Sequence, residues 1–136
     1  MNNDFNINAK SVLRLDNIFC SRFTFERANK ISDGGLDISF KHEMEINDKK
    51  YDVILSTSIS NNDKTLNLFI ELIGTFYFDD TIAIDDKLKD SLIKKNAVAI
   101  LFPYMRSQIT LLTSQPDMTP VILPPININD LLKSTT

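Results

Sequence analysis

The chain has 136 residues, 43% of them hydrophobic and 24% charged, which is the composition of one globular domain spanning residues 1–136. Its formal net charge of −3 argues against electrostatic binding to nucleic acid or to an anionic membrane. With one cysteine (Cys20), one histidine (His42) and three glycines, the chain cannot form an internal disulfide, a Cys/His zinc site or a glycine-rich nucleotide-binding loop, so most enzyme classes are disfavoured.

The N-terminal residues 1–10 are polar and lack the basic and apolar regions of a secretory signal peptide. No apolar run in the sequence reaches the roughly 18–20 residues that a membrane-spanning helix needs. Both observations favour a cytoplasmic protein without a membrane-inserted segment.

The first predicted strand runs from Leu13 to Phe25. Apolar and polar residues alternate along it, as in a strand with one covered face and one face in water. Taken as one unbroken strand, it places Phe19, Phe23 and Phe25 on the same face.

Three further strands are predicted, at 36–46, 51–59 and 66–78. Short polar turns separate them, which predicts an antiparallel meander. His42 falls on the apolar face of the first of these strands, so we expect a core or interface histidine rather than a metal ligand or a base. The last strand has apolar residues on part of both faces and should be partly covered on both.

After residue 80 the apolar spacing changes to that of a helix. Asp85 is the expected N-cap of a first helical segment, which continues through Lys95. From 97 to 114 two neighbouring apolar stripes cover roughly 200° of the helix surface, more than contact with one sheet requires, so we expect a second surface to cover this helix. Pro103 lies inside the pattern and either kinks the helix or begins a new one.

Residues 115–125 are extended, because the prolines among them interrupt any helix. Asn127 is the expected N-cap of a short final helix through Leu132. The order of elements predicts an α+β fold, in which a four-stranded antiparallel sheet is followed by a long helix and a short C-terminal helix.

Two motifs in the C-terminal third resemble the SecB family of export chaperones. The first is the helical segment Ile100–Arg106 (ILFPYMR) followed by Ile109, and the second is the proline-rich segment 120–127 (PVILPPIN). Gly74–Phe76 and Phe23–Glu26 are also similar to positions in the family's strands. The resemblance follows the order of elements along nearly the whole chain.

The resemblance implies a homotetramer built as a dimer of dimers, with the long helices packed between protomers. It also implies ATP-independent holding of unfolded polypeptides in apolar grooves, without catalytic residues, metal or cofactor. The implied client-binding groove contains Phe19, Phe23, Phe25, Phe76, Phe78, Tyr104, Val121, Ile122 and Leu123. The implied oligomer interface contains Ile100, Leu101, Met105, Ile109 and Leu112.

Two roles within the family stay open. One is preprotein export, for which the SecA motor is a candidate partner, although residues 132–136 do not carry the acidic tail that contacts SecA and Arg22 stands where the family has an acidic residue. The other is protection of an antitoxin in a toxin–antitoxin system. A third interpretation is an adaptor of the same fold that binds one fixed partner.

Arg106 either pairs across a subunit interface or is an ordinary exposed arginine.

Overall fold

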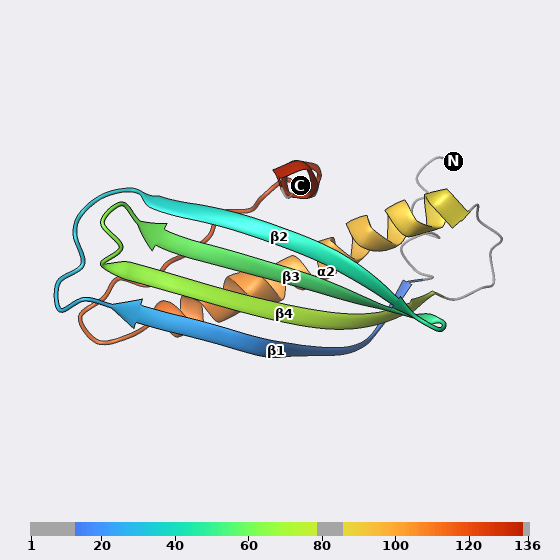
Figure 1. The fold of residues 1–136 in the computed structure, drawn as a ribbon, viewed down its shortest axis with the longest axis horizontal. Coiled ribbons are helices and arrows are strands. Elements are labelled where there is room, and N and C mark those ends of the chain that lie inside the picture. Colours follow the sequence, from blue (N-terminus) through green and yellow to red (C-terminus); the bar gives the residue numbers. More distant parts are fainter. Residues whose placement is uncertain (1–12, 79–85, 135–136) are drawn as a thin grey trace.

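The computed structural model describes residues 13–78 and 86–134. Four strands form one antiparallel sheet, and a long helix crosses one of its faces (Figure 1). A second, short helix lies beside one edge strand of the sheet. The predicted α+β fold class and the predicted order of elements are confirmed. The elements are β1 (Leu13–Arg27), β2 (Leu36–Asn47), β3 (Lys50–Asn61), β4 (Leu66–Phe78), α2 (Asp86–Thr113) and α3 (Ile128–Ser134).

The strand order in the sheet is β1-β4-β3-β2. The strands β2, β3 and β4 form the predicted meander, with neighbours joined by short turns. The first strand pairs with the last one, from Leu13 opposite Phe78 to Arg27 opposite Leu66. The connection 28–35 therefore passes across one end of the sheet, and β1 and β2 become its two edges.

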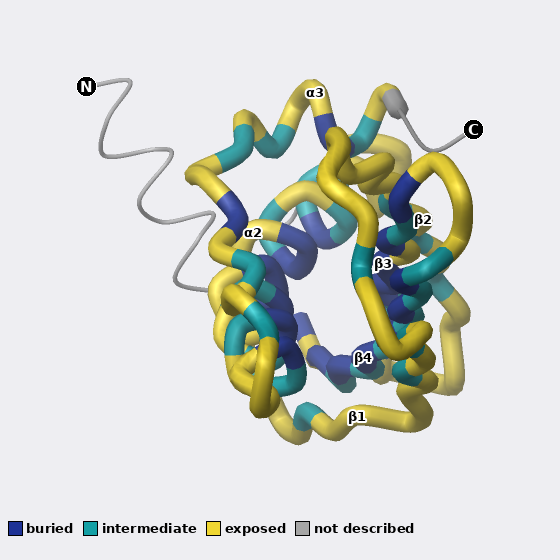
Figure 2. Tube along the Cα trace, turned by 90° about the vertical axis from the view of Figure 1, so that its left-hand side faces the viewer, coloured by how far each residue is buried: buried dark blue, intermediate teal, exposed yellow. Residues whose placement is uncertain are grey.

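The hydrophobic core fills the space between α2 and one face of the sheet, where the buried residues of both layers meet (Figure 2). Gly74 on β4 allows the two layers to approach closely, because a Cβ atom at this position would lie 2.7 Å from Cδ2 of Leu101. The largest fully buried side chains are Val53, Leu55, Ile59, Ile70 and Phe76 of the sheet, Ile93, Val98, Leu101, Met105 and Ile109 of α2, Leu123 of the segment after α2, and Leu131 of α3.

The strand β1 differs from the unbroken alternation that the sequence suggested. Its register against β4 shifts twice, between Leu15 and Asn17 and between Cys20 and Arg22. Each extra residue turns the following side chains to the opposite face. Phe19 consequently pairs with Ile73 on the face away from α2, whereas Phe23 and Phe25 pair with β4 residues that face α2.

The helical patterns predicted on either side of residue 96 form one continuous helix, α2, and Pro103 lies inside it. No new helix begins at Pro103, whose ring is on the exposed side. The predicted N-cap Asp85 lies outside the described residues. The cap of α3 is confirmed, since Oδ1 of Asn127 accepts a hydrogen bond of 2.9 Å from the backbone N–H of Asn129.

His42 connects β2 to α3. Its Nε2 lies 3.1 Å from the carbonyl oxygen of Leu132, and the side chain is half-buried among residues that face α2. The position agrees with the expectation of a packed histidine.

Within residues 13–78 and 86–134, no group of three or more His, Cys, Asp or Glu side chains is placed to hold a metal ion. In the same residues, no helix is long and apolar enough to cross a membrane.

Candidate functional site

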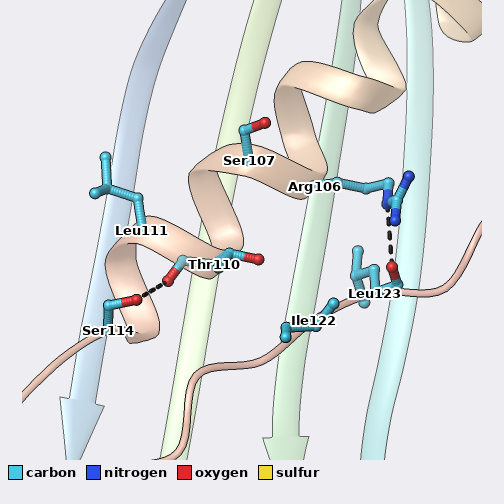
Figure 3. Close-up of a pocket in the computed structure, with 7 residues that line it drawn as sticks. All are labelled: Arg106, Ser107, Thr110, Leu111, Ser114, Ile122 and Leu123. Carbon is cyan, nitrogen blue, oxygen red and sulfur yellow. Dashed lines mark hydrogen bonds between the residues drawn. The ribbon is translucent and has the colours of Figure 1, made fainter.

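The segment 114–127, which connects α2 to α3, is held against α2 by side chains of the helix. The Thr113 hydroxyl accepts a hydrogen bond of 2.8 Å from the Val121 N–H and donates one of 2.7 Å to the Ile109 carbonyl. The Thr110 hydroxyl donates to the Val121 carbonyl at 3.0 Å. Arg106 donates from Nε to the Leu123 carbonyl at 3.0 Å (Figure 3). These bonds fix an extended segment that belongs to no strand.

This attachment decides which side chains of the segment reach solvent. Because Val121 and Leu123 are held toward the helix and the core, Ile122 between them projects outward and is 74% exposed. Leu123 is buried and Val121 is half-buried. The proline-rich segment thus presents one large apolar side chain to water.

A hollow of about 470 Å³ lies between α2 and this segment, and we call it the α2 groove (Figure 3). Two of its lining residues are large and mostly exposed apolar side chains, Leu111 at 64% and Ile122 at 74%. Three others carry hydroxyl groups, and Arg106 is its only charged lining residue. The lining consists of Arg106, Ser107, Thr110, Leu111, Ser114, Ile122 and Leu123.

A second, smaller hollow of about 150 Å³ lies between β1 and α2. Phe19 and Tyr104 line it, and each has nearly half of its side chain exposed. Cys20, also exposed, lies beside them. Two residues of the predicted client groove therefore border the same hollow, Tyr104 from α2 and Phe19 from β1, although the Phe19 side chain points to the sheet face away from the helix.

The remaining predicted groove residues are spread over the molecule. Val121 lines a third hollow, of about 520 Å³, formed with the connection 31–36 and residues 117–119. Phe23 is 53% exposed near the edge of the sheet, and Phe25 is half-buried. Phe76 and Phe78 belong to the core under α2, because they stand on the face of β4 that the helix covers. They do not line an open surface.

The residues predicted to form an oligomer interface also fall into two groups, buried and partly exposed. Leu101, Met105 and Ile109 are fully buried against the chain's own sheet. Ile100 and Leu112 lie at the flanks of α2 and are only half-buried. One of the two apolar stripes of the helix is therefore covered within the chain, and the other remains partly open.

The α2 groove contains residues that sequence reasoning did not select. The hydroxyl groups of Ser107, Thr110 and Ser114 carry no distinctive spacing in the sequence. Arg106 had a signal, because it ends the first SecB-like motif. Its observed contact is with the neighbouring segment of the same chain, a third possibility besides a subunit contact and a purely exposed arginine.

Asp63 and Lys50 have shifted pKa values, and both lie outside the α2 groove. Hydrogen bonds from the Ser32 and Thr65 hydroxyls lower the pKa of the Asp63 carboxyl. A hydrogen bond and ion pair with Asp16 at 2.8 Å raise the pKa of the Lys50 ammonium. Each shift has a local cause at an end of the sheet and neither prepares a group for proton transfer.

The fold and the α2 groove define a class of protein, an α+β domain in which a long helix and an extended segment border a partly apolar hollow. The family model described as "Preprotein translocase subunit SecB" matches residues 6–136. The chain belongs to the SecB family, and the predicted resemblance is confirmed. Membership in this family supports a chaperone-type role.

The solved structures include two that are similar in fold. The SecB-like chaperone Rv1957 of Mycobacterium tuberculosis, in complex with a ChAD peptide from the HigA1 antitoxin Rv1956, has a TM-score of 0.71 at 16% identity, covering 88% of this chain and 95% of that chain. A protein of unknown function from Streptococcus agalactiae has a TM-score of 0.50 at 10% identity, covering 82% of this chain and 96% of that chain.

A sequence match to an uncharacterized protein of Methanocaldococcus jannaschii is short. The two are 51% identical over 37 residues, which are 27% of this chain and 24% of that protein. The match spans about a quarter of the relative's length.

Proposed function

We propose that this protein is an ATP-independent holdase, which binds unfolded polypeptides on the apolar surface along α2 and prevents their aggregation. The observation that carries the proposal is the α2 groove, in which Leu111 of the helix and Ile122 of the neighbouring segment are open to water. Family membership supports the same function. The proposal includes a single domain, a cytoplasmic location and the absence of any catalytic step.

The chemistry of the surface suits clients of many sequences. Removal of apolar surface from water contributes about 25 cal/mol per Å², whatever the order of the client's side chains. Tyr104, about half exposed, extends the apolar surface of α2 toward β1. A client that folds hides its own apolar residues and loses these contacts, so release needs no nucleotide.

The test is aggregation of several unrelated unfolded proteins in the presence of the purified chain, without ATP. We expect suppression of all of them, weakened several-fold by Leu111→Ser combined with Ile122→Ser. Leu88→Ser is the matched control, because Leu88 is also an exposed leucine of α2 but lies outside the groove. Suppression of none of the substrates by the wild-type chain would contradict the proposal.

We propose two alternative cellular roles for this holdase, protection of an antitoxin and preprotein export. The M. tuberculosis neighbour was solved with an antitoxin peptide, which supports the first. The description of the family names preprotein translocase, which supports the second. Stable co-purification with SecA would favour export, whereas a toxin–antitoxin gene pair adjacent to the gene would favour the antitoxin role. Suppression restricted to one substrate would instead favour an adaptor with a fixed partner.

We also propose that the chain assembles into a homotetramer, a dimer of dimers, in which further copies cover the open stripe of α2. Ile100 and Leu112, half-buried at the flanks of the helix, are the residues that we assign to the contact between copies, and Leu111 stays open in the α2 groove. Native mass spectrometry at micromolar concentration should give the mass of four chains. A strictly monomeric mass would contradict this assembly.

A further inference from the structure

Arg27, the last residue of β1, is bound through all three of its side-chain nitrogens. Nε donates a hydrogen bond of 3.0 Å to the Ala28 carbonyl, and Nη2 donates one of 3.1 Å to the Asn29 carbonyl. Nη1 donates one of 2.7 Å to the carbonyl of Asp117, which lies 90 residues further along the chain. The first two bonds fix the plane of the guanidinium, and the third connects the end of β1 to the segment after α2.

Residues 116–120, which we call the strap, depend on this contact. Among the described residues, the hydrogen bond and the ion pair from Arg27 to Asp117 are the polar contacts that tie the strap to the rest of the fold. Prolines bound the strap at both ends and have no N–H to donate. The Met118 side chain is half-buried, and the other four residues of the strap are exposed. The strap therefore buries little apolar surface of its own.

The backbone of the strap is strained at the residue that Arg27 holds. Asp117 has a φ of 56°, in the left-handed region that aspartate tolerates better than most residues but still adopts rarely. Such a conformation costs free energy and persists where other contacts hold it. The carbonyl bond of 2.7 Å is the contact that does so, because the Asp117 carboxylate lies 3.6 Å from Nη2 and is 90% exposed, where an ion pair contributes little.

The strap borders the hollow of about 520 Å³ at this end of the sheet. Residues 117–119 form one wall of the hollow, and residues 31–34 of the connection from β1 to β2 form another. Arg27 bonds to both segments, so it holds the two walls at their present separation. The far end of the strap is fixed independently, because the Thr113 hydroxyl binds the Val121 N–H at 2.8 Å.

We propose that the strap is a movable wall of this hollow. Arg27 holds it closed, and it opens when the contact between Arg27 and Asp117 breaks, while the sheet and α2 stay folded. A segment with little buried surface and few hydrogen bonds opens locally at a lower free energy than the whole fold. Opening relieves the left-handed backbone of Asp117 and uncovers Met118. The strap is a property of the fold and does not depend on the proposed function.

The test is the rate at which hydrogen peroxide oxidises individual methionines of the purified full chain, followed by mass spectrometry of its peptides. Met118 reports on the strap, and Met105, which is fully buried in the core, reports on the whole fold. We expect Arg27→Ala to raise the oxidation rate of Met118 by about three- to tenfold and to leave that of Met105 unchanged.

Arg14→Ala is the matched control, because Arg14 is an exposed arginine at the opposite end of β1. It should leave both oxidation rates unchanged. Asp117→Asn removes the ion pair but keeps the carbonyl acceptor, so the Met118 rate should stay near that of wild type. A rise in Asp117→Asn as large as that in Arg27→Ala would contradict the carbonyl as the point of attachment.

An unchanged Met118 rate in Arg27→Ala would overturn the inference, as would an equal rise at Met105, which would show that the whole fold has loosened. The wild-type chain provides a second measurement if Arg27→Ala does not fold. In urea below the unfolding transition, oxidation of Met118 should accelerate while Met105 stays protected. If the two methionines became reactive together at the transition, the strap would not open on its own and the inference would fail.

Discussion

Thr113 shows how much one buried hydroxyl contributes to the site. It accepts the Val121 N–H and donates to the Ile109 carbonyl, and its side chain is fully buried. Thr113→Val keeps the shape but leaves the Val121 N–H without an acceptor. We expect a loss of about 1–3 kcal/mol in the free energy of unfolding, measured by chemical denaturation, together with faster hydrogen exchange at the Val121 amide.

Thr119→Val serves as the control for Thr113→Val, because Thr119 is an exposed threonine of the same segment. Its effect should stay within about 0.5 kcal/mol. If Thr113→Val had no larger effect than this control, the segment would not depend on the Thr113 hydroxyl for its attachment.

Asp63 makes a contribution to the free energy of unfolding that depends on pH. Its carboxylate accepts hydrogen bonds from the Ser32 hydroxyl at 2.6 Å and the Thr65 hydroxyl at 2.9 Å, which lower its pKa below the ordinary value of 3.8. A lowered pKa in the folded state means that the charged carboxylate stabilises the fold above pH 3.8 and that this contribution disappears as the pH falls through the lowered pKa.

Asp63→Asn should therefore reduce the free energy of unfolding at neutral pH, and the difference from wild type should shrink as the pH falls below 3.8. Urea denaturation at a series of pH values measures this difference. Asp37→Asn, at an exposed position of β2, should show no comparable trend. A difference that stayed constant from neutral to acid pH would contradict the assigned hydrogen bonds.

At the scale of elements, Gly74 sets the distance between β4 and α2. A Cβ atom there would lie 2.7 Å from Cδ2 of Leu101 and 2.9 Å from the Phe76 ring, both in the core. Gly74→Ala should destabilise the fold by about 1–3 kcal/mol, because the packed layers would have to separate. Leu101→Val in the same chain should recover part of this loss, as measured by a double-mutant cycle.

Gly35→Ala is the control for Gly74→Ala, since no atom lies within 4 Å of a Cβ at Gly35. Its backbone φ is not positive, so an alanine fits without strain and should be neutral or slightly stabilising. Equal effects of the two substitutions would show that close packing at Gly74 has no energetic importance.

The strands, the meander and the cap at Asn127 could be predicted because each depends on local spacing or on one local hydrogen bond. The pairing of β1 with β4 could not, since it joins residues as distant as Leu13 and Phe78. The two register shifts in β1 likewise carry no clear sequence signal, and they moved Phe19 away from Phe23. For this reason a prediction from alternation placed these aromatic residues on one face.

The site was predictable only where a motif marked it. The SecB-like motifs indicated Tyr104, Arg106 and the segment around Ile122, and these residues do border the hollows along α2. Tertiary packing, and not residue type, decides which apolar side chains remain exposed to solvent. Phe76 and Ile122 are both large and apolar, yet the first lies under the helix and the second lies on a segment held in front of it.

At the scale of the whole molecule, the two edges of the sheet differ. The β2 edge is covered by α3 through His42, and its outward side chains include Lys41, Glu43 and Glu45, which discourage pairing with another strand. The β1 edge is long, and Phe19 and Phe23 are about half exposed on it. A long edge with exposed aromatic side chains is a surface on which another chain can add contacts.

We therefore expect the proposed assembly to cover β1. Hydrogen exchange at the amides of β1 should slow by tenfold or more when the protein is raised from a concentration at which it is monomeric to one at which it is assembled, whereas the inner strands β3 and β4 should change little beyond the general gain in stability. The two concentrations are fixed by native mass spectrometry on the same samples. Exchange in β1 that stayed equally fast in the assembled protein would leave this edge open and would place the contacts between chains on α2 alone.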